Sequence, residues 1–262
     1  MSPSTKDAQV IEKILRDCGE MLLECLIDGR NKGEWSGTQF KATADHLAHN
    51  FLVSALNQAF PELPVVSEED ASSSSEHTGD YFIIDPIDGT ASFSHGFAGW
   101  VTQAAYISEG RPIMAGIYAP ATDEYFAAMS ASGAYCNGRR LFATKNISSA
   151  EYLIDNYPEP HGISLQLMRN LKIPNYLESG SISLKICRVA DGSADLFVKD
   201  MEPRDWDVAA PMLLIAEAGG ILTDINGATL ILGMPGRRHK GLISTTSPLV
   251  AEQVQAWLTS IK

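Results

Sequence analysis

Two carboxylates stand three residues apart at the end of an apolar run in this chain. Residues 81–84 are Tyr-Phe-Ile-Ile, which predicts a buried strand with no polar face. Asp85 and Asp88 follow, and Gly89 and Thr90 come next. Carboxylate oxygens bind hard cations, and the free amides of such a segment bind an anion. Because the same pattern is typical of a turn that ends a strand, the other acids of the chain decide between the two interpretations.

Three further acids stand where predicted elements begin or end. Glu68 follows the short apolar strand 63–66, Asp45 lies in the first turn of a predicted helix, and Asp207 precedes the apolar helix 208–218. Taken singly, Asp45 and Asp207 are typical of helix N-caps, and Glu68 belongs to an acidic run of the kind that is usually solvated.

Taken together, these acids predict a metal site. If the strands that end at Glu68 and Asp85 are neighbours, then Glu68, Asp85 and Asp88 converge, and Asp207 faces them from a second lobe. Several carboxylates in one cleft repel one another unless cations lie between them. Ligand sets made of oxygen alone favour Mg²⁺ or Mn²⁺ over zinc, and two such ions can stabilise an in-line phosphoryl displacement.

The overall composition limits the classes of partner. The chain has 262 residues, of which 45% are hydrophobic, so it can bury a large core. Its formal net charge of −12 disfavours a nucleic acid polymer but leaves a small phosphate ester open. Its four cysteines form no C-x-x-C pair, and neither a hydrophobic signal segment nor an apolar run of membrane-spanning length is present. We therefore expect a cytoplasmic protein that neither enters a membrane nor binds zinc.

Hydrophobic periodicity predicts two lobes. Residues 1–145 contain two amphipathic helices, a polar stretch between them and an antiparallel-rich sheet, with Asn137-Gly138 as a hairpin turn. After a polar linker near 145–150, strands and helices alternate, which predicts a smaller α/β lobe at 146–262 that supplies Asp207 and substrate contacts. The long serine-rich run at 71–76 is typical of a loop.

Three segments together resemble the signature segments of the inositol monophosphatase family. They are Val-Ser-Glu-Glu at 66–69, Asp-Pro-Ile-Asp-Gly-Thr at 85–90, and the stretch from Trp206 to Gly220, and they occur in the family's order. The resemblance covers nearly the whole chain. It implies an α/β (α+β) fold of the layered αβαβα sandwich type, a homodimer, lithium sensitivity and dependence on Mg²⁺, with two or three ions per site and Mn²⁺ as an alternative.

The resemblance also implies roles for single residues. The metal ligands would be Glu68, Asp85, the carbonyl of Ile87, Asp88 and Asp207, and we expect Asp88 to contact two metals. The amides of Gly89 and Thr90 would bind phosphate. The Thr90 hydroxyl and Asp45 would orient and help deprotonate a metal-bound water held by Glu68, which attacks phosphorus directly.

One segment departs from the family's pattern. Upstream of Asp45 the usual S-P-V-T-x-A-D is replaced by Gln-Phe-Lys-Ala-Thr-Ala-Asp at 39–45. Lys41 occupies an apolar position of the pattern, and Thr43 is displaced by one residue. The role of Asp45 therefore depends less on the resemblance than the role of Asp85 does.

The segments that would contact the substrate give two different indications. Residues 93–97 resemble the inositol monophosphatase branch, and Asp200 falls where those enzymes bind inositol hydroxyls. Residues 183–187 resemble the 3′(2′),5′-bisphosphate nucleotidase branch, in which Lys185 would bind a second phosphate; a solvated helix lysine is the simpler interpretation. We also expect Ser181 at the substrate.

A basic turn at 236–240 (Gly-Arg-Arg-His-Lys) is a further place where an anionic substrate could be met. Basic turns of this kind are more often solvated loops, and we take that as the simpler interpretation.

The leading hypothesis is a Mg²⁺-dependent phosphomonoesterase acting on inositol 1-phosphate or a related polyol or sugar phosphate. The alternatives are 3′-phosphoadenosine 5′-phosphate, then histidinol phosphate or fructose 1,6-bisphosphate. A catalytically silent binding protein of the same fold would lack metal ligands that this chain retains. A calcium-binding EF-hand would gather its acids in one loop, whereas these acids are scattered over the chain.

Overall fold

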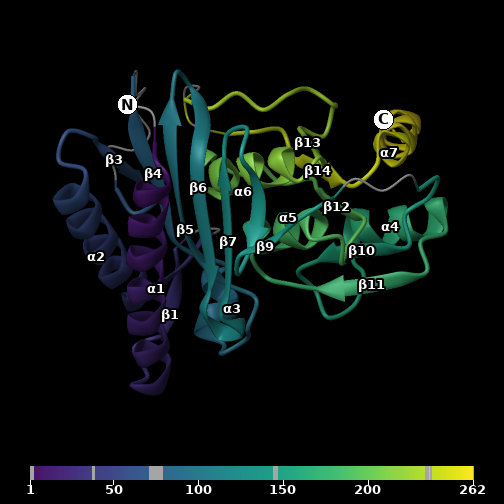
Figure 1. Cartoon of the computed structure of the whole chain (residues 1–262). Helices are drawn as coiled ribbons and strands as arrows, with labels where there is room; N and C mark the ends of the chain where they lie inside the picture. Colours follow the sequence, from purple (N-terminus) through teal and green to yellow (C-terminus); the bar gives the residue numbers. More distant parts are fainter. Residues whose placement is uncertain are drawn as a thin grey trace.

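Two large β-sheets, three layers of helices and one two-stranded hairpin build the described part of the molecule (Figure 1). The computed structural model describes residues 3–36, 39–70, 79–143, 147–233, 236 and 238–261, with the backbone alone for 34–36 and 39–42. From one side to the other, the layers are α1 with α2, a seven-stranded sheet, α5 with α6, a five-stranded sheet, and α4 with α7. This arrangement confirms the predicted layered αβαβα sandwich.

The seven-stranded sheet has the order β3-β4-β5-β6-β7-β8-β9. Its strands are β3 (Val65–Ser67), β4 (Tyr81–Asp88), β5 (Val101–Ser108), β6 (Arg111–Ala119), β7 (Glu124–Met129), β8 (Gly133–Cys136) and β9 (Arg139–Arg140). β3 is parallel to β4 and every other pair is antiparallel. The predicted Asn-Gly hairpin joins β8 to β9, with positive φ at Asn137 (46°) and Gly138 (76°).

Two helices cover the outer face of this sheet. They are α1 (Thr5–Ile27) and α2 (Thr43–Ala59), both predicted from their periodicity. Ser4 caps α1, and the apolar stripe of α1 is buried against the sheet. The stretch between the helices, treated above as merely polar, forms the hairpin of β1 (Gly33–Ser36) and β2 (Gln39–Ala42). Strands of four residues with mixed polarity give no periodic signal, and Gly37 lies outside the described residues.

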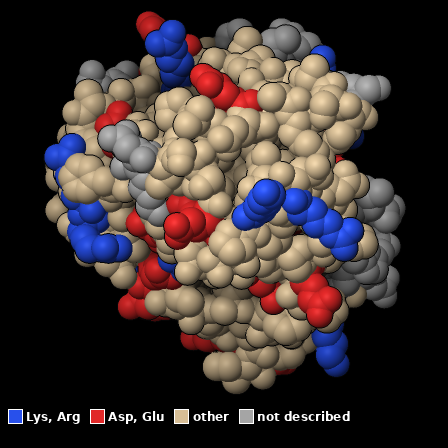
Figure 2. All heavy atoms as spheres, turned by 90° about the vertical axis from the view of Figure 1, so that its right-hand side faces the viewer, with Lys and Arg blue, Asp and Glu red and all other residues tan. Residues whose placement is uncertain are grey.

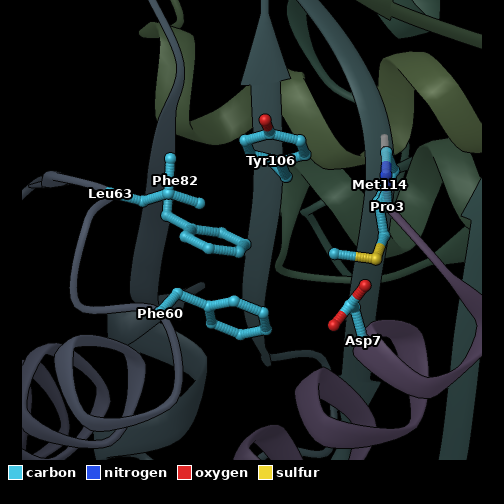
Figure 3. Close-up of a pocket in the computed structure, with 7 residues that line it drawn as sticks. All are labelled: Pro3, Asp7, Phe60, Leu63, Phe82, Tyr106 and Met114. Atoms are coloured by element: carbon cyan, nitrogen blue, oxygen red, sulfur yellow. The ribbon is translucent and has the colours of Figure 1, made fainter. Parts of the chain in front are cut away.

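A small apolar cavity lies between α1 and this sheet (Figure 3). Its volume is about 10 Å³, close to the space of one water molecule. Phe60, Phe82 and Tyr106 line it, with ring centroids 5.0 Å apart for Phe60–Phe82 and 5.5 Å apart for Phe82–Tyr106. Asp7, also at the wall, is engaged in the capping box with Ser4. The cavity is therefore a packing feature of the outer layer.

The five-stranded sheet has the order β11-β10-β12-β14-β13. Its strands are β10 (Tyr152–Asp155), β11 (Asn175–Glu178), β12 (Leu196–Lys199), β13 (Ile221–Thr223) and β14 (Leu242–Thr245). β10 is parallel to β11 and β12, and β14 is antiparallel to its two neighbours. The remaining helices are α3 (Thr90–Ser94), α4 (Gly162–Leu171), α5 (Ile182–Ala190), α6 (Asp205–Glu217) and α7 (Pro248–Ser260), with a 3₁₀ turn at Pro120–Thr122.

Helix α6 lies in the middle layer and packs against β6 and β7 as well as α5. It is apolar around its whole circumference, which is the pattern of a helix buried on all sides. The largest core cluster joins residues of both halves of the chain, among them Ile117 of β6, Leu214 of α6 and Phe197 of β12. The predicted lobe boundary at 145/146 stays a prediction, since 144–146 lie outside the described residues, as does the serine-rich run.

Candidate metal and phosphate site

Three carboxylates from two layers meet at one place. Asp85, Asp88 and Asp207 each offer one oxygen, and these oxygens all lie within 4.8 Å of one another. The first two belong to β4, and Asp207 lies in the first turn of α6. Glu68 follows β3 directly, and β3 pairs in parallel with β4, so Glu68 leaves the sheet at the same edge. The strand pairing on which the predicted convergence depended is confirmed.

A bulge in β4 points both of its acids in one direction. β4 continues past the predicted 81–84, and its ladder to β5 pairs Asp85 with Gln103 and next Asp88 with Val101. One extra residue therefore stands on β4, where Pro86 lacks an N–H for the ladder. In a regular strand, residues three apart point to opposite faces. The extra residue reverses the alternation, which brings both carboxylates to the side of α5 and α6.

The start of helix α5 holds Asp88. Asp88 Oδ2 accepts hydrogen bonds from Ser181 Oγ (2.6 Å) and Ser183 N (2.7 Å), and Oδ1 accepts one from Ile182 N (3.1 Å). The positive end of the helix dipole adds to these contacts. Ser181, expected at the substrate, is fully buried, and its Oγ also accepts from Leu184 N. A serine before a predicted helix was the available signal for this cap; its partner Asp88 is 93 residues away.

Asp85 is the carboxylate of this cluster that can still accept a further contact. Its side chain is 1% exposed, Oδ1 accepts from Ile87 N (3.1 Å), and Oδ2 has no hydrogen-bond partner among the described residues. An unpaired buried oxygen is costly unless a cation or a proton meets it. Both Asp88 oxygens already accept hydrogen bonds. A cation could therefore meet Asp85 Oδ2, and the expectation that Asp88 contacts two metals stays a prediction.

Burial and mutual repulsion perturb these acids. Burial, followed by the charges of Glu68 and Asp88, raises the pKa of Asp85 well above its ordinary range. Burial, followed by Asp207, does the same to the pKa of Glu68. Burial and then Asp88 raise the pKa of Asp207 to about 7, although Asp207 Oδ2 accepts from Arg204 N at 2.6 Å. A hard divalent cation relieves such repulsion, so the donor set fits Mg²⁺ or Mn²⁺.

Thr90 connects this cluster to α2. Thr90 Oγ1 lies 3.0 Å from the carbonyl oxygen of Ile87 and 3.5 Å from Asp45 Oδ1. Asp45 is 3% exposed, and its negative charge contributes to the raised pKa of Glu68. The structure therefore brings Asp45 to the edge of the cluster despite the altered segment that precedes it.

Gly89 allows the turn from β4 into α3. Its φ of 94° lies in the left-handed region, and an added Cβ would meet Gly99 O at 2.8 Å. The chain then enters α3 at Thr90, so the first amides of the helix are free of intrahelical partners. These are the groups expected to bind phosphate.

Lys185 does not match the interpretation of a solvated helix lysine. It is 1% exposed, donates from Nζ to Gly180 O (3.2 Å), and lies 5.1 Å from the centroid of the Phe197 ring. Burial lowers the pKa of its ammonium group to about 7. The side chain of Lys185 therefore extends toward the turn that donates hydrogen bonds to Asp88. Asp200, the other expected substrate contact, is exposed after β12.

The basic turn at 236–240 is only partly a solvated loop. Arg238 pairs with Glu202 at 3.0 Å on the surface, as a solvated turn would. His239 is buried, and its Nε2 lies 2.9 Å from Asp205 Oδ1 at the start of α6. Arg237 and the side chain of Lys41 lie outside the described residues.

Comparison with known proteins places the chain among phosphatases. The sequence profile of the inositol monophosphatase family matches residues 5–259. The chain is 31% identical to a fructose-1,6-bisphosphatase/inositol-1-monophosphatase of Thermotoga maritima, over 82% of this chain and 83% of that protein. It is 30% identical to the Nus factor SuhB of Pseudomonas aeruginosa, over 81% and 83%. The extragenic suppressor protein SuhB of Bartonella henselae superposes with a TM-score of 0.81 at 27% identity, covering 95% and 97%.

Proposed function

Because the chain belongs to the inositol monophosphatase family, which includes relatives named as phosphatases, we propose that it hydrolyses a small phosphate monoester with Mg²⁺ at the acid cluster. The observation that carries the proposal is the meeting of Asp85, Asp88 and Asp207 oxygens within 4.8 Å. Inositol 1-phosphate or a related polyol phosphate is the proposed substrate. Lithium inhibition and a homodimer are further parts of the proposal.

The metal ligands that we propose are oxygen donors at the edge of the first sheet and the start of α6: Glu68, Asp85, the carbonyl of Ile87, Asp88 and Asp207. They would hold two or three Mg²⁺ ions, with Mn²⁺ as a substitute. When bound, such ions polarise phosphate oxygens and lower the pKa of water. Ser181 and the α5 amides would keep Asp88 oriented throughout.

The chain's own groups then have separate roles. The amides of Gly89 and Thr90 would donate to the phosphate oxygens, since α3 presents them without intrahelical partners. Glu68 would orient the attacking water. Thr90 Oγ1 would accept a hydrogen bond from that water, and Asp45, 3.5 Å from Oγ1, would receive the proton. The water would thus attack phosphorus directly, without a phosphoenzyme.

The surface fits a small substrate better than a polymer. Figure 2 shows the face of α4, α7 and β11, where acidic and basic side chains stand in small separate groups. The net charge of −12 adds a general repulsion toward polyanions. None of the helices in the described part of the chain has the length and apolarity needed to span a bilayer.

A sugar bisphosphate is the second candidate substrate, because a relative 31% identical to this chain carries fructose-1,6-bisphosphatase in its name. The nucleotide 3′-phosphoadenosine 5′-phosphate ranks lower, since the buried Lys185 ammonium is directed to Gly180 O. Histidinol phosphate ranks last. Asp200, exposed on the loop before α6, is the proposed contact for polyol hydroxyls.

A phosphate-release panel tests these candidates. Purified protein is incubated with each of the four esters at saturating Mg²⁺, with and without lithium. We expect the highest kcat/KM for inositol 1-phosphate and its loss with lithium. Strong turnover of the bisphosphate nucleotide with none of inositol 1-phosphate would reject the proposed substrate.

The variant Asp85→Asn tests the role of the cluster. It removes the charge of the carboxylate with the unpaired oxygen. We expect kcat/KM to fall by at least about 100-fold, because mutation of a residue that only hydrogen-bonds to a metal ligand already lowers activity by about 10–100-fold. Asp17→Asn, on the exposed face of α1, is the control and should retain activity. Full activity of Asp85→Asn would disprove the metal mechanism.

A further inference from the structure

Helix α2 carries a second residue toward the acid cluster. His49 stands four residues after Asp45, so both side chains project from one face of the helix. His49 Nδ1 lies 2.8 Å from Ser67 Oγ. Ser67 is the last residue of β3, is fully buried, and directly precedes Glu68. Neither His49 nor Ser67 has a role in the mechanism above.

The segment that begins at Ser67 carries Glu68 away from a short strand. β3 has three residues, lies at the edge of the sheet as described, and pairs within the described part of the chain with β4 alone. Its chain then turns, with Asp70 N donating to Ser67 O (3.2 Å) and Glu69 N lying 3.4 Å from Ser67 Oγ. Glu68 is the second residue of this turn. A short edge strand followed by a turn has little backbone pairing to fix its end.

The contact from His49 ties this segment to helix α2. Because Ser67 Oγ accepts from Glu69 N, its hydroxyl proton can be donated to His49 Nδ1. The same rigid helix holds Asp45 beside Thr90, so α2 fixes two points of the site together. The distance between Asp45 and Glu68 then depends on α2 and on the His49–Ser67 contact.

We propose that His49 is a positioning residue that holds the turn at 67–70 through Ser67, and so presents Glu68 to the metal site at a fixed place relative to Asp45 and Thr90. This inference deepens the proposed function and rests on it. His49 acts through Ser67, so its removal changes metal affinity and kcat while the groups that bind the ester stay in place.

The test compares His49→Ala, His49→Asn and Ser67→Ala by Mg²⁺ titration calorimetry and by steady-state kinetics. The Asn amide can replace the ring Nδ1 as the partner of Ser67, whereas Ala cannot. We expect His49→Ala to weaken Mg²⁺ binding by about 10-fold, in line with the loss of a group that orients a metal ligand. We expect kcat to fall by a similar factor with KM changed less than about two-fold, and His49→Asn to restore most of both.

A double-variant cycle and a control on the same helix complete the design. His49→Ala combined with Ser67→Ala should be no worse than either single variant, because both remove one contact. His46→Ala, exposed on α2, should match the wild type in Mg²⁺ affinity and kcat. Circular dichroism and Tm establish that each variant is folded.

Several outcomes would overturn the inference. They are wild-type Mg²⁺ affinity and kcat in His49→Ala, additive losses in the double variant, or equal losses in His49→Asn and His49→Ala. Failure of the proposed function is a different result: the wild type would bind Mg²⁺ yet release no phosphate from any ester of the panel. The calorimetric comparison of the variants decides the role of His49 in that case too.

Discussion

Asp88 differs from the acids around it because the first turn of α5 donates three hydrogen bonds to it. These hydrogen bonds fix the orientation of its carboxylate. Asp85, three residues earlier, has one hydrogen bond and an unpaired oxygen. Two aspartates of one motif therefore have different surroundings: protein groups hold both oxygens of Asp88, whereas one oxygen of Asp85 accepts no hydrogen bond from the described residues.

Removing the hydroxyl of Ser181 should lower both the stability of the fold and its affinity for Mg²⁺. Ser181→Ala removes the 2.6 Å bond to Asp88 and the cap of α5, and should cost about 0.5–2 kcal/mol of stability. It should also weaken Mg²⁺ binding by about 10–100-fold, because Asp88 loses an orienting partner. Chemical denaturation and Mg²⁺ calorimetry measure the two effects.

The matched control for Ser181→Ala is Ser4→Ala. Ser4 caps α1 in the same way, far from the acids in the sequence and exposed. We expect a similar stability loss with unchanged Mg²⁺ affinity. If both variants kept wild-type Mg²⁺ affinity, the hydroxyl of Ser181 would be a helix cap and nothing more.

At the scale of elements, α5 is tied to the first sheet by a charged pair. Arg188 donates to both carboxylate oxygens of Glu124 at the start of β7, with Nη1 2.8 Å from Oε1, and also to Asp191. Hydrogen bonding from Arg188 lowers the pKa of Glu124 below its ordinary range. The two partners are about three-quarters buried, so water and salt screen their attraction less than they screen that of an exposed pair.

Breaking this pair from one side should be more harmful than removing it. Arg188→Met leaves Glu124 without its main partner, and should lower the free energy of unfolding by about 1–3 kcal/mol. Arg188→Met with Glu124→Leu should recover part of that loss. Lys13→Met, which removes an exposed pair on α1, should change stability by less than about 0.5 kcal/mol. Urea titrations measure all three. If Arg188→Met were no worse than Lys13→Met, the pair of Arg188 and Glu124 would contribute nothing measurable to stability.

The elements that the sequence predicted correctly share a strong periodic signal. α1, α2, α6 and α7 each have several turns of apolar spacing or a uniformly apolar run, and β5, β6 and β7 are long. The missed strands β1, β2, β11, β13 and β14 have three or four residues each, too short for a period to show, whereas the equally short β3 was predicted from the apolar run at 63–66. Their pairing is decided by tertiary packing, which local sequence does not specify.

The same distinction applies to the site. Asp85, Asp88 and Asp207 were identified because each stands at the end or start of a strongly patterned element. The β4 bulge that turns Asp85 and Asp88 to one side, and the contact of Ser181 with Asp88, depend on residues far apart in the sequence. So does the burial of Lys185, whose helix was predicted but whose neighbours were not.

At the scale of the whole molecule, repulsion within the acid cluster lowers the free energy of unfolding of the metal-free protein. The protein carries a net charge of −12, and the pKa values of Glu68, Asp85 and Asp207 are raised. If Mg²⁺ binds there as proposed, it would stabilise the fold by mass action, by about 2.7 kcal/mol at 100 times its dissociation constant. For a chain of this size, that corresponds to a rise in Tm of roughly 5–10 °C.

The pH dependence of stability should therefore change when the metal is removed. Asp207 has an ordinary pKa of 3.8 in the unfolded chain and a pKa of about 7 in the metal-free fold, and Glu68 and Asp85 shift in the same direction. Between these two values the folded state binds more protons than the unfolded state, so the free energy of unfolding falls as pH rises. This contribution is fully present below about pH 4 and is lost as pH passes about 7.

We expect the Tm of protein dialysed against EDTA to fall between pH 5 and pH 8. Saturating Mg²⁺ should abolish or reverse that fall, because the metal binds deprotonated carboxylates and its binding releases protons. Asp207→Asn should flatten the metal-free profile, whereas Asp17→Asn, on the surface of α1, should leave it unchanged. A metal-free Tm that rises across this range would show that the three acids titrate normally, and the repulsion that the cation is inferred to relieve would not exist.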